Sequence, residues 1–151
     1  YRSQFQLPTV SLRYFTVYGP RQRPDMAIHR LFKCAIDGLE FRLNGDGTQR
    51  RDFTFVSDVV EANIRVAKAL MDGREIKHFY NVGFGATVTM NDLISLVSDL
   101  TGHVMRVRKV DSAQGDPNVT FSDSTGWSPE VDLGTGLRLQ LAAQKVHSED
   151  R

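Results

Sequence analysis

The chain has 151 residues, the size of one ordinary domain, and its 40% hydrophobic and 25% charged content is typical of soluble globular proteins. Its 19 basic and 18 acidic side chains nearly cancel, which excludes the strong positive field that attracts nucleic acid or anionic membranes. No apolar stretch approaches the ~20 residues that cross a bilayer, and the polar start 1–8 is unlike a signal peptide. The single Cys34 offers neither a disulfide framework nor metal-ligand spacing, so we expect a packed thiol in a cytoplasmic protein without a metal site.

The first predicted elements are a strand and a helix joined by a loop. Residues 9–15 alternate and are rich in β-branched and aromatic side chains, which predicts a strand that ends at Gly19-Pro20. Pro24-Asp25 is typical of a helix start, and the helix should run to Asp37 with Gly38 as its stop. Its apolar stripe consists of Ile28, Leu31, Phe32, Ala35 and Ile36.

A turn of Asn44-Gly45-Asp46-Gly47 separates the next two predicted strands, 41–43 and 52–56. Asn-Gly is typical of hairpins, so we expect these strands to pair with each other. Ser57 is then expected to cap a helix over 58–72, with Gly73 beyond its end.

The remaining pattern continues the alternation of strands and helices. Residues 79–82 predict a strand, and Thr89 with Asp92 resembles a capping box for a helix that ends near Gly102. A half-buried strand over 104–110, a loop over 111–129 and a helix over 133–146 follow. This alternation predicts the α/β class. The apolar first strand is expected to need sheet partners on its N-terminal side.

Two basic segments are candidates for binding an anion. Arg21 and Arg23 lie between a strand end and a helix start, where α/β proteins bind ligands and helix N–H groups favour anions. Arg50-Arg51 follow a glycine-rich turn, and a guanidinium there could grip a phosphate or simply pair with a nearby acid.

Other polar signals are weaker. Thr16 and Tyr18 lie two residues apart on one side of a strand, so their hydroxyls either face a cleft or are satisfied within the protein. Gly83-Phe84-Gly85 suggests a dinucleotide loop, but Val88 replaces the third glycine, so a tight turn is expected. Trp127 is expected to be a packing anchor. The four histidines show no metal or nucleophile spacing.

Four segments, in order, resemble the motifs of one family: 12–27, 45–59, 80–85, and 115–116 followed by 126–129. This family is the nucleotide-sugar epimerase/dehydratase group of extended short-chain dehydrogenases. The sequence Phe15-Thr16-Val17-Tyr18-Gly19-Pro20, followed by Arg23 to Ala27, is most similar to the UDP-glucuronate 4-epimerases. The resemblance implies a redox-neutral reaction, in which bound NAD takes hydride from C4 of the sugar and returns it to the other face.

The resemblance also implies roles for individual residues. Tyr14 and Phe15 would lie near the nicotinamide of NAD. Thr16 and Arg23 would hold the sugar carboxylate, which suits a hydroxyl and a guanidinium. The nucleotide would be bound by Arg51 at the diphosphate, by Phe41 and Leu43 around the uracil, and by Asp116.

The family's catalytic Tyr-x-x-x-Lys and its glycine fingerprint are absent from this sequence, since Phe5 stands where the lysine would follow Tyr1. The chain therefore resembles the C-terminal, substrate-binding portion of a Rossmann-type enzyme over 1–151, with no catalytic residue of its own. Residues 1–19 and about 79–83 would belong to the Rossmann sheet. The missing N-terminal half would bind most of the NAD, and the intact enzyme would be a homodimer.

Two further departures bear on the nucleotide. Ala113 replaces a polar residue, and the segment 123–126 is short, so the wall over the nucleotide is expected to be incomplete. A nucleotide-sugar 4,6-dehydratase or 4-ketoreductase is the alternative within the enzyme class. A truncated, non-catalytic binding or assembly module is the alternative outside it.

Overall fold

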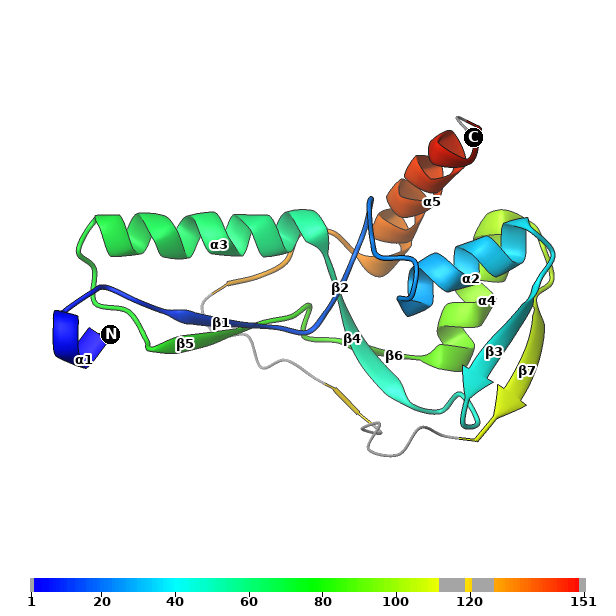
Figure 1. Cartoon of the computed structure of the whole chain (residues 1–151), viewed down its shortest axis with the longest axis horizontal. Coiled ribbons are helices and arrows are strands. Elements are labelled where there is room, and N and C mark those ends of the chain that lie inside the picture. The colour runs from blue at the N-terminus through cyan, green and yellow to red at the C-terminus, as the bar shows by residue number, and fades with distance from the viewer. Residues whose placement is uncertain (1, 112–118, 121–126, 150–151) are drawn as a thin grey trace.

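Short strands and helices alternate along the chain in a computed structural model that describes residues 2–111, 119–120 and 127–149 (Figure 1). The elements in chain order are α1 (Arg2–Phe5), β1 (Ser11–Tyr14), β2 (Thr16–Tyr18), α2 (Ala27–Ile36), β3 (Glu40–Asn44), β4 (Arg50–Phe55), α3 (Val56–Met71), β5 (Phe79–Val82), β6 (Thr87–Thr89), α4 (Met90–Thr101), β7 (Arg106–Val110) and α5 (Leu133–Glu149). The α/β class is confirmed.

The described strands form three small sheets. β1 pairs with β5 in parallel, in the register Ser11↔Phe79 to Tyr14↔Val82. β4 lies at the centre of the second sheet, parallel to β2 and antiparallel to β6. β3 and β7 make the third sheet, also parallel. Parallel pairing brings segments that are distant in the sequence together, and it places β1 and β2 at the junction between two sheets.

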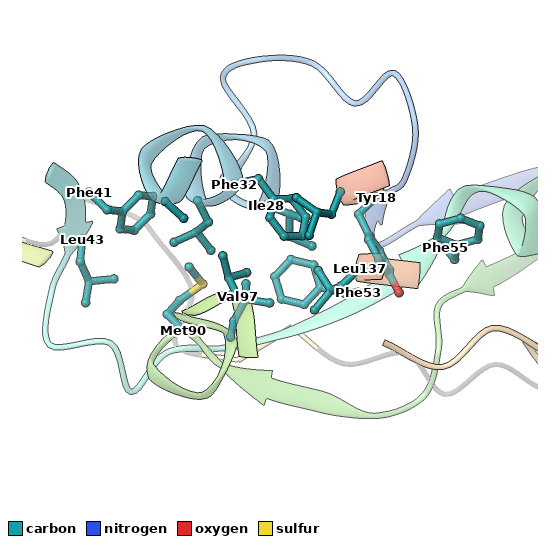
Figure 2. Packing of buried hydrophobic residues seen from close by; sticks show 14 residues of the cluster. Tyr18, Ile28, Phe32, Phe41, Leu43, Phe53, Phe55, Met90, Val97 and Leu137 are labelled. Atoms are coloured by element: carbon teal, nitrogen blue, oxygen red, sulfur yellow. The ribbon is translucent and has the colours of Figure 1, made fainter. Parts of the chain in front are cut away.

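The helices divide the molecule into two packed regions. At one end, α3 runs along β1 and β5 (Figure 1), where Val59, Ala62 and Val82 form a small buried cluster. At the other end, α2 and α4 pack between the β3–β7 sheet and α5, and a larger cluster of 14 buried residues fills the interior (Figure 2). We call these the small cluster and the main core.

The main core explains why α2 forms where the sequence predicts it. Its residues Ile28, Leu31 and Phe32 have no exposed surface, because the 3.6-residue period places them on one face. The helix begins at Ala27 rather than at Pro24, without a side-chain cap. Among the described residues, no helix is both long enough and apolar enough to span a bilayer.

The predicted hairpin between residues 41–43 and 52–56 is wrong. β3 pairs with β7, whereas β4 pairs with β2 and β6. The turn itself forms: Gly45 and Gly47 have φ values of 73° and 87°, and Asp46 accepts a hydrogen bond from the backbone N–H of Thr48 at 2.9 Å. The turn carries the chain from one sheet to another, although the buried residues of β3 and β4 belong to the same main core.

Two local predictions at helix starts had different outcomes. Ser57 is not the cap of its helix, because α3 already begins at Val56 and has no side-chain cap. Thr89 is confirmed as a cap, since its hydroxyl oxygen accepts a hydrogen bond from the N–H of Asp92 at 3.0 Å. The predicted strand 9–15 is interrupted at Phe15, where β1 ends and β2 begins to pair with a different sheet.

Candidate functional site

The loop between β2 and α2 forms one wall of the candidate site. It begins at Gly19, whose φ of 139° and close approach to Val56 and Phe55 leave no room for a side chain. Arg21 has a φ of 65°, in the left-handed region that few non-glycine residues adopt. The loop is therefore held in an unusual conformation next to a cavity, an arrangement that recurs at functional sites.

A cavity of about 760 Å³ lies over the ends of β1 and β2. We call it the larger cavity. The four residues that sequence reasoning placed at the sugar and nicotinamide, Tyr14, Phe15, Thr16 and Arg23, all line it, together with Arg21. A cavity of this size is ample for a sugar ring with part of a cofactor.

Arg23 stands at this cavity with an acidic partner. Its guanidinium donates to the Asp25 carboxylate at 2.9 Å, and the two side chains are 74% and 68% exposed. An exposed ion pair of this kind is weak. An anionic ligand could therefore bind Arg23 beside Asp25, or displace Asp25 from Arg23, at a small cost in free energy. Thr16 is half-buried on the same wall.

A second, smaller cavity of about 180 Å³ adjoins the first, and Thr16 and Met26 line both. Arg51 lines the smaller cavity, where its guanidinium donates to the carbonyl oxygen of Arg50 at 2.9 Å. We call the two adjoining cavities together the groove; Arg23 lines only its larger part and Arg51 only its smaller part. Such a groove suits an elongated ligand that carries negative charge at two places.

Phe41 and Leu43 also line the smaller cavity, but their side chains are only 3% and 2% exposed and point into the main core (Figure 2). The alternation of a strand turns their neighbours Arg42 and Asn44 outward. Sequence reasoning missed Arg42, Asn44 and Arg30, all of which line this cavity. The alternating pattern of 40–44 was the signal that could have identified the first two.

Tyr18 resolves one of the alternatives left open by the sequence. Its ring is 1% exposed, and its hydroxyl donates to the carbonyl oxygen of Leu133 in α5 at 3.5 Å. Burial, followed by the nearby carboxylates of Asp132 and Asp58, raises the pKa of Tyr18 far above its ordinary value. The hydroxyl is therefore a satisfied structural group, and only Thr16 of the pair is half-exposed beside the groove.

The turn at Gly83-Phe84-Gly85 is confirmed as structural. The N–H groups of Phe84 and Gly85 donate to the buried carboxylate of Asp52 at 2.8 and 3.0 Å. These amides are the donors that a phosphate loop would present, and here they already have an anionic partner. Trp127 packs against the small cluster, as expected of a packing anchor. Asp116, Ala113 and the segment 123–126 lie outside the described residues.

Comparison with known proteins decides the family. Residues 1–83, more than half of the chain, match the NAD dependent epimerase/dehydratase family. This chain belongs to that family. An uncharacterized UDP-glucose epimerase of Bacillus subtilis is 35% identical over 148 residues, which cover 94% of this chain and 46% of that protein. A UDP-glucuronate 4-epimerase of Thermodesulfobacterium geofontis is 34% identical over an alignment of 156 positions, which covers 99% of this chain and 47% of that protein.

Solved structures confirm the fold. A UDP-glucuronic acid 4-epimerase from Bacillus cereus, in complex with UDP-glucuronic acid and NAD, superimposes with a TM-score of 0.86 at 33% identity. The match covers 97% of this chain and 48% of that chain. The chain thus has the fold of the corresponding part of an extended short-chain dehydrogenase, and it spans about half the length of the curated relatives it matches.

Proposed function

We propose that this chain is the substrate-binding portion of a cytoplasmic, NAD-dependent nucleotide-sugar 4-epimerase that acts on UDP-glucuronate. The observation that carries the proposal is the groove, whose two cavities share Thr16, with Arg23 lining the larger cavity and Arg51 the smaller one. A UDP-sugar carboxylate has its negative charges at two places, the diphosphate and C6 of the sugar. The two guanidinium groups match that distribution.

At the sugar end, Arg23 and Thr16 would hold the carboxylate. A guanidinium gives a carboxylate two parallel donors, and a hydroxyl adds a third, whereas a CH2OH group needs no cation. The exposed partner Asp25 would keep Arg23 near the cavity before the ligand arrives. This arrangement supports UDP-glucuronate over UDP-glucose as the substrate.

At the nucleotide end, Arg51 would bind the diphosphate, and Phe41 and Leu43 would shape the uracil site through the backbone between them. Their buried side chains fix β3, while the smaller cavity runs past it. Asp116 completes the set proposed for the nucleotide.

The fit to NAD is partial. Tyr14 and Phe15 line the larger cavity and are the described residues proposed to lie near the nicotinamide, where NAD would accept hydride from the sugar C4 and return it. Within the described part of the chain, the one turn that resembles a dinucleotide loop is already bound to Asp52. Most of the NAD would therefore be bound by an N-terminal Rossmann half, which would also supply the Tyr-x-x-x-Lys that this sequence lacks.

The parallel pair β1–β5 supports the same division. Within the substrate-binding portion 1–151, residues 1–19 and about 79–83 would belong to the larger parallel sheet of that half. The intact enzyme would be a homodimer. The family's description includes dehydratases, so a 4,6-dehydratase or 4-ketoreductase with the same groove is the second candidate. A non-catalytic binding module is the third, and reading the gene upstream of Tyr1 for a Tyr-x-x-x-Lys separates it from the other two.

The substrate is tested by calorimetry with UDP-glucuronate and UDP-glucose. Arg23→Ala should weaken UDP-glucuronate by about 1.5–3 kcal/mol, the scale of hydrogen bonds to charged groups, and leave UDP-glucose nearly unchanged. Equal losses for both ligands would mean that Arg23 does not read the carboxylate. A wild-type chain that binds neither UDP nor a UDP-sugar would overturn the proposed function.

A further inference from the structure

A buried glutamine on the C-terminal helix reaches back to the loop that walls the larger cavity. Gln140 in α5 is only 1% exposed. Its Oε1 accepts from the backbone N–H of Gly19 at 2.9 Å, and its Nε2 donates to Oε1 of Gln22 at 2.9 Å. A buried amide needs such partners, and both lie in the same loop.

Gln22 extends this connection to the two elements on either side of the loop. Its Nε2 donates to the carbonyl oxygen of Val17 in β2 at 3.0 Å, and its Oε1 also accepts from the N–H of His29 in α2 at 3.1 Å. The two carboxamides thus form a relay from α5 through the loop to β2 and α2. If either side-chain amide were rotated by 180°, its NH2 group would face another N–H donor. The hydrogen-bond network therefore fixes the orientation of both amides.

The helix that carries the relay is itself fixed against β2. Gly136 packs directly on the hydroxyl of Tyr18, and that hydroxyl donates to the Leu133 carbonyl oxygen at 3.5 Å. Asp132 caps the start of α5 through the N–H of Thr135 at 3.0 Å. The position of Gln140 is therefore set independently of the loop that it binds.

We propose that Gln22 and Gln140 are positioning residues, which hold the loop 19–23 in the conformation that presents Arg21 and Arg23 to the larger cavity. The positive φ of Arg21, at 65°, is a conformation that a free loop rarely keeps, so it needs fixed contacts on both sides. The relay supplies them at Gly19 and Gln22. The identity of the ligand that this loop binds rests on the proposed function, whereas the restraint of the loop by the two glutamines does not.

The relay acts on one end of the groove. Loop residues line the larger cavity, while the described lining of the smaller cavity contains none of residues 19–23. Loss of the relay should therefore weaken the sugar-carboxylate contact and spare the nucleotide. A general loss of packing would affect both ends alike.

The test compares two equal substitutions on one helix. Gln140→Leu removes the relay, whereas Gln144→Leu removes a hydrogen bond from the same helix to the His29 carbonyl oxygen, at 3.2 Å, and leaves the relay intact. Gln22→Leu is the second relay variant, in case Gln140→Leu does not fold. Each is measured by backbone amide exchange at Gly19 and by calorimetry with UDP and UDP-glucuronate.

We expect exchange at Gly19 to be about tenfold faster in Gln140→Leu than in the wild type, because its amide loses its partner. UDP-glucuronate should weaken about tenfold in both relay variants, the size of one lost hydrogen bond to a charged group, with UDP unchanged. Gln144→Leu should change neither measurement.

Unchanged exchange at Gly19 in Gln140→Leu would overturn the relay. Parallel losses for UDP and UDP-glucuronate would overturn its action at the sugar end. If the wild-type chain binds neither ligand, the proposed function fails, and the exchange measurements still decide whether Gln140 holds the loop.

Discussion

The backbone of Gly136 lies directly against the hydroxyl of Tyr18, so closely that a Cβ at position 136 would overlap it. The same Cβ would approach the ring of Phe55 at 2.8 Å. Tyr18 also contacts Phe55 edge to face, with ring centroids 5.4 Å apart. The contact between α5 and β2 therefore depends on a missing side chain, and it sets how closely the C-terminal helix approaches the site.

Gly136→Ala should destabilise the fold by about 1–3 kcal/mol, because the added methyl group overpacks a filled core. Gly134→Ala is the matched control two residues earlier, where the nearest atom to an added Cβ is the Asp132 carboxylate oxygen at 3.3 Å. That change should be neutral or stabilising by up to about 1 kcal/mol, since alanine favours helix. Urea denaturation followed by circular dichroism measures both. Equal effects would show that α5 does not depend on this contact.

Asp52→Asn should destabilise the protein by about 1–3 kcal/mol, because two backbone N–H groups lose a charged acceptor in a buried place. Asp52 has no exposed surface and accepts from Phe84 and Gly85. The control is Asp37→Asn, which breaks only the exposed ion pair with Lys33 and should cost less than about 1 kcal/mol. A loss no larger for Asp52 than for Asp37 in urea denaturation would contradict the structural role of the carboxylate.

Arg51→Lys should weaken UDP, UDP-glucose and UDP-glucuronate by a similar factor of about ten, because lysine keeps the charge but loses the planar fork proposed to bind the diphosphate. Arg50→Lys is the control, since the Arg50 guanidinium is bound to Thr87 through Nε at 2.8 Å and lies outside both cavities described above. Calorimetry on the folded variants separates the two residues. Unchanged UDP affinity in Arg51→Lys would end the diphosphate assignment.

His29 should make stability fall in mild acid. Burial, the largest cause, lowers the pKa of His29, and the nearby Lys33 lowers it further against the opposing effect of a hydrogen bond to Gln22. Below about pH 6.5 the unfolded chain binds a proton that the folded chain resists, so stability decreases as the pH falls. His29→Gln should reduce the difference in urea midpoint between about pH 7.5 and about pH 5.5. The same midpoint difference in His29→Gln as in the wild type would refute this origin.

The helices were predictable because their signals are local. The apolar stripe of α2, the Thr89 cap of α4 and the left-handed Gly73 and Gly102 at helix ends each depend on neighbouring residues. Strand pairing is not local. Asn44-Gly45 specified a turn, but which strand lies beside β3 depends on β7, far along the chain, and no short pattern encodes that choice.

The site shows the same division. Tyr14, Phe15, Thr16 and Arg23 are close in sequence, and they do line one cavity. The Tyr18 hydroxyl is bound by the carbonyl oxygen of Leu133, and the loop is bound through Gly19 by Gln140. Both partners are distant in the sequence and reach the site only through folding. The outward Arg42 and Asn44 were overlooked because the resemblance pointed to their buried neighbours.

The single tryptophan has a consequence for how unfolding would be observed. Trp127 packs against the small cluster of Val59, Ala62 and Val82, away from the 14 residues of the main core. A region with so few buried contacts opens at a lower free energy than the whole fold. Tryptophan fluorescence therefore reports on the region of α3, β1 and β5, whereas circular dichroism sums all the helices, α2, α4 and α5 among them. We therefore expect the fluorescence change to precede the loss of circular dichroism on heating, and coincident transitions would show that the two clusters unfold together.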